Sequence, residues 1–219
     1  MHSLWLLSTF LLTVWSQQTQ TWHTLLGEES FSSQNEFEKS WAYLYPWGSD
    51  HNGAARMDKA HVHLANGVVT ITAQKISGQP DAKHGGKNIK INYLSGAIHA
   101  KQHFKVSASG GLDFIGEFKA PVARGTWPAF WLTADSGWPP EVDLAEWKGS
   151  GKISFNTFNT SKIVSAKDVG YPSPGEWHKF KTELRAMNNK KDVEIKFYMD
   201  SKLVTTQHAS GYVGKGMWL

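Results

Sequence analysis

The sequence contains no cysteine, and this absence excludes several classes of protein. A disulfide-stapled fold, a zinc site built on thiolates and a cysteine nucleophile all require a residue that the chain does not have. Charged residues are also few, at 19% of 219, and the lysines are scattered along the chain. A polybasic arm for nucleic acid is therefore excluded, while the net charge of +4 allows a mild attraction to acidic partners.

Long hydrophobic runs are scarce, and the most marked one lies at the amino terminus. Residues 4–15 form an apolar run of about a dozen residues, shorter than the ~20 that a membrane helix needs. Val14 and Ser16 match the small-residue positions of a signal-peptide cleavage site. We therefore predict a signal peptide over residues 1–16, a secreted domain over residues 17–219 and no association with a membrane. A buried first strand or helix is the alternative for this run.

Helical periodicity is missing too. No stretch of twelve residues shows an apolar stripe at helical spacing, whereas short alternating stretches are separated by Gly, Pro, Asn and Asp. This pattern predicts an all-β sandwich or barrel of antiparallel sheets. The chain is long enough for one sizeable core and contains no linker, so we expect one domain. The predicted strands cover residues 68–74, 95–100, 112–119, 126–133, 141–147, 153–158, 177–184 and 193–199.

The most informative segment carries several carboxylates. Alternate residues of a flat strand share a face, so Glu141 and Asp143 would point together and Glu146 away. A one-residue bulge at Leu144-Ala145 would bring Glu146 to the same face. The carboxyl groups of Glu141 and Glu146 would then lie about 5 Å apart, the separation that a retaining glycosidase needs. Crowded acids also raise at least one pKa, which provides a proton donor near neutral pH.

Tryptophans surround these acids. An exposed acidic strand edge is the alternative for the carboxylates, but aromatic rings stack on the apolar faces of sugars. Within residues 126–133, Trp127, Ala129 and Trp131 would share one face, and the small Ala129 leaves space between the two rings. Trp138 precedes the acids and Trp147 follows them. We therefore predict that these four tryptophans bind substrate, with core packing as the alternative for each of them and most of all for Trp127.

Two blocks of the sequence, residues 125–131 around Trp127 and Trp131 and residues 141–146 with the three acids, resemble a known enzyme family. It is glycoside hydrolase family 16, and in particular its laminarinase-type endo-β-1,3(4)-glucanases. The resemblance implies a concanavalin A-like β-jelly roll, a sandwich of two curved antiparallel sheets with a concave substrate cleft. It also implies Glu141 as the nucleophile, Glu146 as the acid/base and Asp143 as an assistant that orients Glu141. The residues that carry it are Gly125-Thr126-Trp127-Pro128-Ala129-Phe130-Trp131 and Glu141-x-Asp143-x-x-Glu146.

The sequence departs from the family pattern in places. The family often has a His on the strand after the acids, and residues 156–159 contain none. Thr182-Glu183-Leu184 stands where a Glu-Trp pair is common. Both departures concern the choice of sugar rather than the reaction. The chain also ends at residue 219, where the family starts another core strand, so we expect that this domain lacks its C-terminal strands.

Two further polar features are weaker signals. Asn52 and Arg56 lie in a Gly-containing loop after Trp47, and we predict that they bind substrate, with a purely structural role in the loop as the alternative. Asn159-Thr160-Ser161 is an acceptor sequence for an N-glycan.

The histidines do not predict a metal site. His61 with His63, and His99 with His103, would each share a strand face, but no third ligand is tied to either pair. We therefore expect no metal in the site and no cofactor. Some members of the family carry a structural calcium ion, which stays open here although no loop rich in Asp and Asn requires it.

The expected function is that of a secreted endo-glycosidase that hydrolyses β-1,3- or mixed β-1,3/1,4-glucan by a two-carboxylate double displacement with retention. The expected partner is the polysaccharide substrate, bound by a monomer. Two alternatives are a non-catalytic, lectin-like jelly roll that binds glycans and a transglycosylase with the same residues. The basic pI of about 9.1 also keeps an acidic galactan open as the substrate.

Overall fold

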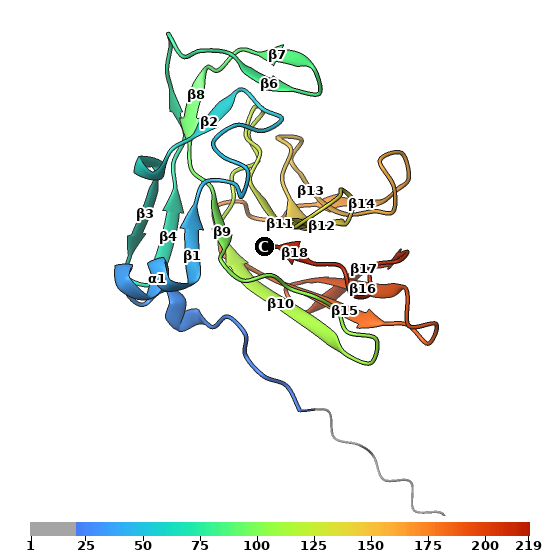
Figure 1. Ribbon diagram of the computed structural model, residues 1–219. Coiled ribbons are helices and arrows are strands. Elements are labelled where there is room, and N and C mark those ends of the chain that lie inside the picture. The colour runs from blue at the N-terminus through green and yellow to red at the C-terminus, as the bar shows by residue number, and fades with distance from the viewer. Residues whose placement is uncertain (1–20) are drawn as a thin grey trace, which may run out of the picture.

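Two antiparallel sheets are stacked face to face in the computed structural model, which describes residues 21–219 (Figure 1). The five-stranded sheet has the order β14 (Val164–Gly170), β13 (Lys152–Phe158), β12 (Glu141–Glu146), β11 (Ala129–Ala134) and β18 (Met217–Trp218). The four-stranded sheet has the order β10 (Gly111–Phe118), β15 (His178–Ala186), β16 (Val193–Met199) and β17 (Lys202–Ala209). The predicted all-β jelly-roll sandwich is confirmed, while the predicted signal peptide lies outside the described residues.

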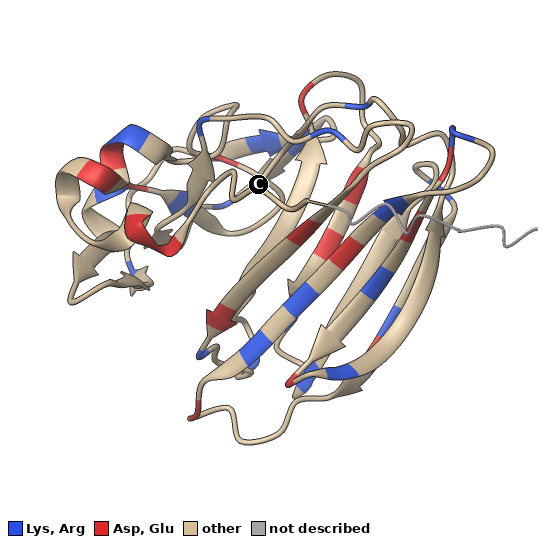
Figure 2. Cartoon of the chain, turned by 90° about the horizontal axis from the view of Figure 1, so that it is seen from below, with Lys and Arg blue, Asp and Glu red and all other residues tan. Residues whose placement is uncertain are grey.

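The inner faces of the two sheets meet in one hydrophobic core. Along β16, Val193, Ile195 and Phe197 are fully buried and the residues between them are only partly buried, as expected of a strand with one wet face. Phe155 of the five-stranded sheet packs against Phe180 and Phe197, with ring centroids 6.4 and 5.6 Å away. The outer face of the four-stranded sheet carries Lys, Arg, Asp and Glu side chains along its strands (Figure 2).

Short elements that precede β10 lie beside the sandwich (Figure 1). The 3₁₀ turn η1 (Glu28–Phe31) and helix α1 (Gln34–Ser40) lead into β1 (Trp41–Tyr43), which pairs with β9 (Ile98–Ala100). Two hairpins are formed by β3 (Val62–Ala65) with β4 (Val68–Ile71) and by β6 (Ala82–His84) with β7 (Lys87–Ile89). The remaining elements are η2 (Lys59–His61), β2 (Ala55–Met57), β8 (Tyr93–Ser95), which runs parallel to β2, and β5 (Gln74–Lys75).

Some element boundaries differ from the predicted ones for local reasons. The strand predicted over residues 126–133 begins only at Ala129, because Pro128 has no N–H for a strand ladder. Strand β14 is not among the predicted strands, because it lies at the edge of the sheet and its side chains alternate only weakly between buried and exposed. Helix α1 spans 7 residues, which is too short to show an apolar stripe over twelve residues. The Ser33 Oγ caps it by accepting a hydrogen bond from Glu36 N at 3.2 Å.

Trp147 belongs to the core, so its prediction as a substrate-binding residue is wrong. Only 1% of its surface is exposed, and its ring packs edge-on against Tyr171 and Phe180, both at 5.5 Å between centroids. The physical reason is strand parity. Once Glu146 faces the cleft, the next residue along the chain points to the opposite side of the sheet, which is the core.

Strand β18 lies at the edge of the five-stranded sheet beside β11. Its Met217 is fully buried and exchanges backbone hydrogen bonds of 2.9 and 3.0 Å with Phe104. The expectation that further C-terminal strands follow stays a prediction. Among residues 21–219, no helix is long and apolar enough to cross a bilayer.

Candidate active site

A bulge in β12 brings the carboxylates to one face of the five-stranded sheet. Against β11, Asp143 pairs with Trp131 and Ala145 pairs with Phe130, so that Leu144 has no partner. The register with β13 shifts in the same segment, between Asp143 and Glu146. The bulge predicted at Leu144-Ala145 is thereby confirmed. Beyond it the parity of the strand is reversed, and Glu146 joins the face of Glu141 and Asp143.

Hydrogen bonds connect the carboxylates to their surroundings. Asn156 of β13 donates from Nδ2 to Asp143 Oδ2 at 2.7 Å and to Glu146 Oε2 at 2.9 Å, which proves that these acids share a face. The indole Nε1 of Trp138 donates to Glu141 Oε2, and that of Trp127 to Glu146 Oε1, each at 2.6 Å. Both tryptophans are about half exposed, at 46% and 53%. Each glutamate is therefore held in one orientation by an aromatic side chain that also faces solvent.

The proximity of the acids changes their ionisation. Burial raises the pKa of Asp143 to about 8, and the negative charges of Glu146 and Glu141 add to the rise, against a hydrogen bond from Asn156. Burial also raises the pKa of Glu141, a rise that the Trp138 hydrogen bond reduces and the charge of Glu146 increases. At neutral pH Asp143 therefore carries a proton, and the negative charge of the cluster is lowered by one.

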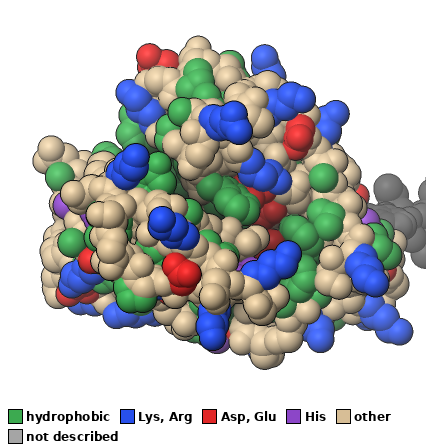
Figure 3. All heavy atoms as spheres, turned by 90° about the horizontal axis from the view of Figure 1, so that it is seen from above, with side chains coloured by type: hydrophobic (Ala, Val, Ile, Leu, Met, Phe, Trp, Pro, Cys, Tyr) green, Lys and Arg blue, Asp and Glu red, His purple; other side chains and the backbone are tan. Residues whose placement is uncertain are grey.

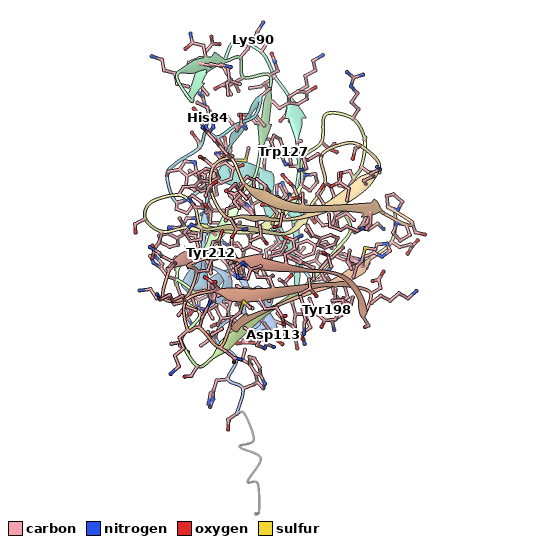
Figure 4. All side chains as sticks on the ribbon, turned by 90° about the vertical axis from the view of Figure 1, so that its right-hand side faces the viewer. His84, Lys90, Asp113, Trp127, Tyr198 and Tyr212 are labelled. Atoms are coloured by element: carbon pink, nitrogen blue, oxygen red, sulfur yellow. The ribbon has the colours of Figure 1, made fainter. Side chains whose placement is uncertain are left out.

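Tyr212 anchors the beginning of β12 from inside the core. Its hydroxyl accepts a hydrogen bond from Glu141 N at 2.9 Å and reaches the main-chain oxygens of Glu141, at 3.1 Å, and of Phe158. In Figure 4, Tyr212 lies between the two sheets and Trp127 lies nearer to His84. Because the anchor holds the backbone of Glu141, it fixes the position from which that carboxylate enters the cleft.

Replacement of Tyr212 by phenylalanine is expected to lower the free energy of unfolding by about 2 kcal/mol, because Glu141 N loses its partner. For a domain of this size, the melting temperature should fall by roughly 4–8 °C. Tyr198→Phe is the matched control, since that hydroxyl meets Glu183 at 3.3 Å on the other sheet and its loss should change stability by less than about 0.5 kcal/mol. Equal losses in thermal unfolding of the two variants would contradict the anchoring role of Tyr212.

An aromatic wall extends from the carboxylates toward the β6–β7 hairpin. Trp131, which pairs with Asp143, lies 6.5 Å from the ring of Tyr45, 6.1 Å from Trp47 and 5.8 Å from His51, between centroids. Tyr45 and Trp47 are stacked 5.2 Å apart with an interplanar angle of 5°. Burial lowers the pKa of His51, so that its ring is neutral at physiological pH. The wall offers flat, mostly apolar surfaces of the kind that sugar rings stack on.

The loop that follows Trp47 is held by an ion pair. Arg56 Nε lies 2.7 Å and Nη2 2.8 Å from the two carboxylate oxygens of Asp50, and Nη1 donates to Gln79 Oε1 at 3.1 Å. The guanidinium of Arg56 is thus occupied within the loop, and this contact supports its alternative, structural role. Asn52 is exposed and makes no side-chain hydrogen bond to the described residues. The substrate-binding role of both residues stays a prediction.

The remaining polar side chains take part in local contacts. His61 Nδ1 lies 3.3 Å from Thr72 Oγ1, His99 Nδ1 lies 2.8 Å from Leu44 O, and His103 pairs with Asp135. Within residues 21–219, no three His, Asp or Glu side chains are close enough together to hold a metal ion. The side chain of Asn159 donates to His208 O at 3.0 Å and accepts from Ser210 N at 2.7 Å. Its glycosylation stays a prediction.

The surface above the five-stranded sheet is hollowed (Figure 3). Acidic side chains lie at the bottom of the hollow, hydrophobic side chains line it, and Lys and Arg side chains stand around it. A jelly roll that presents two clustered glutamates and a set of tryptophans in an open hollow has the form of a glycoside hydrolase.

Comparison with known proteins places the chain in a family. The family model described as Glycosyl hydrolases family 16 matches residues 50–214. The chain is 48% identical over 197 residues to a galactan endo-beta-1,3-galactanase of Flammulina velutipes, a match that covers 90% of this chain and 78% of that protein. It is also 38% identical over 85 residues to the endo-1,3-1,4-beta-glycanase ExsH of Rhizobium meliloti (strain 1021), covering 38% and 17%. The chain therefore belongs to glycoside hydrolase family 16.

Solved structures agree on the fold. The endo-1,3-beta-glucanase from Streptomyces sioyaensis superposes with a TM-score of 0.61 at 19% identity, covering 83% of this chain and 76% of that one. Porphyranase B from Zobellia galactanivorans superposes with a TM-score of 0.59 at 16% identity, covering 83% and 72%. At such low identity these two similarities show the shared fold and nothing finer.

Sequence reasoning missed several residues of the site. Asn156 alternates with the apolar Phe155 as Ser154 does with Ile153, and this alternation in the strand next to the acids was the available signal. Tyr45, Trp47 and His51 lie in an irregular segment, where no periodicity shows which way a side chain points. Lys148 lies two residues beyond β12, and its Nζ is 2.8 Å from Glu146 Oε2.

Proposed function

We propose that this chain is a retaining endo-glycosidase that cleaves β-1,3-linked galactan. The reaction is supported by one observation above all, the bulge that sets Glu141, Asp143 and Glu146 on one face of the sheet. The substrate is supported by the 48% identity to a galactan endo-beta-1,3-galactanase over 90% of the chain. It also agrees with residues 156–159 and Thr182-Glu183-Leu184, where the sequence departs from the laminarinase-type pattern.

Each carboxylate has a distinct task in this proposal. Glu141 attacks the anomeric carbon while Glu146 gives its proton to the glycosidic oxygen, so that the bond to the leaving sugar breaks and a glycosyl ester forms on Glu141. Water then attacks the same carbon, its proton goes to the Glu146 carboxylate, and Glu141 leaves. Asp143 keeps the negative charge of the cluster low because it holds a proton at neutral pH. Trp138 orients the nucleophile and Trp127 orients the acid/base.

Trp131 supplies the stacking surface beside the reacting carbon. It pairs with Asp143 on the neighbouring strand and is backed by the ring of His51. A galactose ring presents an apolar face of C–H groups to such an indole. We place Trp131, with Trp138 and Trp127 on the two sides of the acids, among the substrate-binding residues.

A second candidate substrate is β-1,3- or mixed β-1,3/1,4-glucan. The partial match to the endo-1,3-1,4-beta-glycanase ExsH supports it, although this match spans only 38% of the chain. The reaction and the residues that perform it are the same for both substrates. Only the shape of the hollow around the sugar hydroxyls distinguishes them.

The substrate is tested by release of reducing ends from β-1,3-galactan, laminarin, lichenan, xyloglucan and carrageenan. We expect β-1,3-galactan to be cleaved at least about tenfold faster than the others, since a site that hydrogen-bonds one hydroxyl configuration rejects the other. Fastest cleavage of laminarin or lichenan would favour the glucan. Retention on affinity gels without cleavage of any polymer would favour the lectin-like alternative. Transfer products that are longer than the substrate would favour the transglycosylase.

The stereochemical outcome tests the double displacement. The first product of an active enzyme should be the β-anomer, because two inversions at one carbon restore its configuration. Proton NMR in the first minutes of hydrolysis, before mutarotation, measures this anomer directly. An initial α-anomer would overturn both the assignment of Glu141 as nucleophile and the short separation between the two carboxyl groups.

We also propose that the enzyme is secreted and acts as a monomer. Galactan and glucan are polymers too large to enter a cell, so an endo-acting hydrolase has to meet them outside. The apolar run at residues 4–15, which lies outside the described residues, supports export as a signal peptide.

A further inference from the structure

The side chain of Lys148 contacts the carboxylate of Glu146, the proposed acid/base. Its Nζ lies 2.8 Å from Glu146 Oε2. The lysine side chain is 45% exposed, whereas that of Glu146 is 9% exposed. A half-exposed cation thus contacts the buried group that has to act as the acid and then as the base of the reaction.

The described partners of the Glu146 carboxylate are all donors. Oε1 receives the Trp127 indole N–H, and Oε2 receives the Asn156 amide and the Lys148 ammonium. A protonated carboxyl group has to donate a hydrogen bond of its own and accepts fewer. The described contacts of Glu146 are therefore contacts that a carboxylate accepts.

The charges around Glu146 have opposite effects. Glu141 and Asp143 on the same strand favour the protonated form of Glu146 whenever they are ionised, but Asp143 holds a proton at neutral pH. Ser154 and Asn156 of β13 and Trp127 before β11 are uncharged. Among the described residues, Lys148 is the positive group that contacts Glu146, and it opposes the protonation that the first step requires.

We propose that Lys148 is a positioning residue that sets the protonation state of Glu146, holding it as a carboxylate in the empty cleft and releasing it when the sugar chain binds. The proposal rests on the proposed function, in which Glu146 is the acid/base. A general acid lies within hydrogen-bond reach of the oxygen it protonates. The ammonium that contacts Glu146 is therefore close to the two sugars at the scissile bond, and their hydroxyl oxygens replace the carboxylate as its partners.

The backbone at Lys148 is fixed, whereas its side chain has room to turn. Gly149 has a φ of +66° and packs so closely on residues 123–125 that a Cβ there would lie 2.8 Å from Ala123 O. Because the backbone here packs closely against residues 123–125, we assign the motion to the flexible stem of the lysine. The release of Glu146 is thus a change of side-chain rotamer.

The two half-reactions should respond to Lys148 in opposite ways. Loss of the charge in Lys148→Met favours protonated Glu146, which helps the first step and hinders the second, where Glu146 has to accept a proton. With the polysaccharide, the basic limb of the kcat/KM profile should move to higher pH by about one unit. A nearby charge shifts a pKa by about 1–3 units, and we expect the low end of this range because the lysine is half exposed. With an activated aryl glycoside, whose second step limits turnover, the acidic limb of kcat should move up by less, because the bound sugar has already drawn the ammonium away from Glu146.

The experiment compares Lys148→Met with Lys148→Arg and Lys152→Met. Lys148→Arg keeps the charge and should retain both limbs of the wild type. Lys152 begins β13 and makes no ion pair with any described residue, so Lys152→Met removes the same charge without contacting Glu146 and should leave both profiles unchanged. A Lys148→Met profile that does not move, or moves no more than that of Lys152→Met, overturns the proposal. Thermal unfolding of each variant confirms that it folds.

A titration of the free protein separates this inference from the proposed function. Carboxyl carbon NMR of glutamate-labelled protein, with Glu146→Gln to assign the signal, follows Glu146 without any substrate. The signal should titrate at higher pH in Lys148→Met than in the wild type and in Lys152→Met. An unshifted titration overturns the role of Lys148 even in an active enzyme. A shifted titration in a protein inactive on every sugar supports the charge effect and rejects the glycosidase proposal.

Discussion

Replacement of Glu141 by alanine is expected to reduce turnover by on the order of 10⁴–10⁶-fold, with polysaccharide and with activated aryl glycosides alike. Both substrates need a carboxylate to attack the anomeric carbon, and a good leaving group does not replace the missing nucleophile. Initial rates of reducing-end and aryl release measure the loss. Glu117→Ala, on β10 in the other sheet, is the control and should keep wild-type rates.

Added azide distinguishes a lost nucleophile from a damaged site. The small anion fits the space that the Glu141 side chain leaves and attacks an activated glycoside from the same side. The product of this rescue should be the α-glycosyl azide, formed with a single inversion. No rescue, or rescue as the β-azide only, would mean that Glu141 is not the nucleophile.

Replacement of Glu146 by alanine is expected to have an effect that depends on the leaving group. A sugar alcohol leaves only when its oxygen is protonated, so kcat/KM for the polysaccharide should fall by about 10²–10⁴-fold. A dinitrophenyl glycoside needs little protonation, and its kcat/KM should change far less. The ratio of the two losses measures how much of the catalysis depends on the acid.

Azide completes this test as well. In Glu146→Ala the nucleophile is intact, so azide should attack the glycosyl ester in place of activated water and give the β-glycosyl azide. Equal losses for good and poor leaving groups, without rescue, would show that the roles of Glu141 and Glu146 have been assigned wrongly. Thermal unfolding should be close to that of the wild type, because removal of Glu146 also relieves its repulsion with Glu141, and the donors of the half-exposed Trp127 and Lys148 can bond water instead.

The sequence alone determined the catalytic strand, because strand parity is a local property. Side chains of a strand alternate between two faces, so Glu141 and Asp143 lie on the same face. A bulge of one residue is the smallest change that brings Glu146 to that face as well. The same reasoning places Trp131 and Ala129 on one face, and the structure pairs Trp131 with Asp143 on the neighbouring strand. Applied once more, it would have sent Trp147 to the core, so that error was avoidable.

The tertiary structure alone decided what surrounds the acids. Asn156 on β13 and Trp127 just before β11 meet Glu146 only because the two strands beside β12 bring them there, and the register of these strands depends on the whole sheet. Lys148 is near in sequence, but its direction depends on a turn packed against residues 123–125.

The aromatic wall and the anchor of β12 depend on contacts between residues that are still further apart in the sequence. His51 reaches Trp131 from an irregular loop, and Tyr212 reaches Glu141 across the core from the segment after β17. Alternation along a strand specifies which face a side chain occupies, and it does so from neighbouring residues alone. It contains no information about which distant segment covers that face, because packing between elements depends on the complete set of side chains that fill the core.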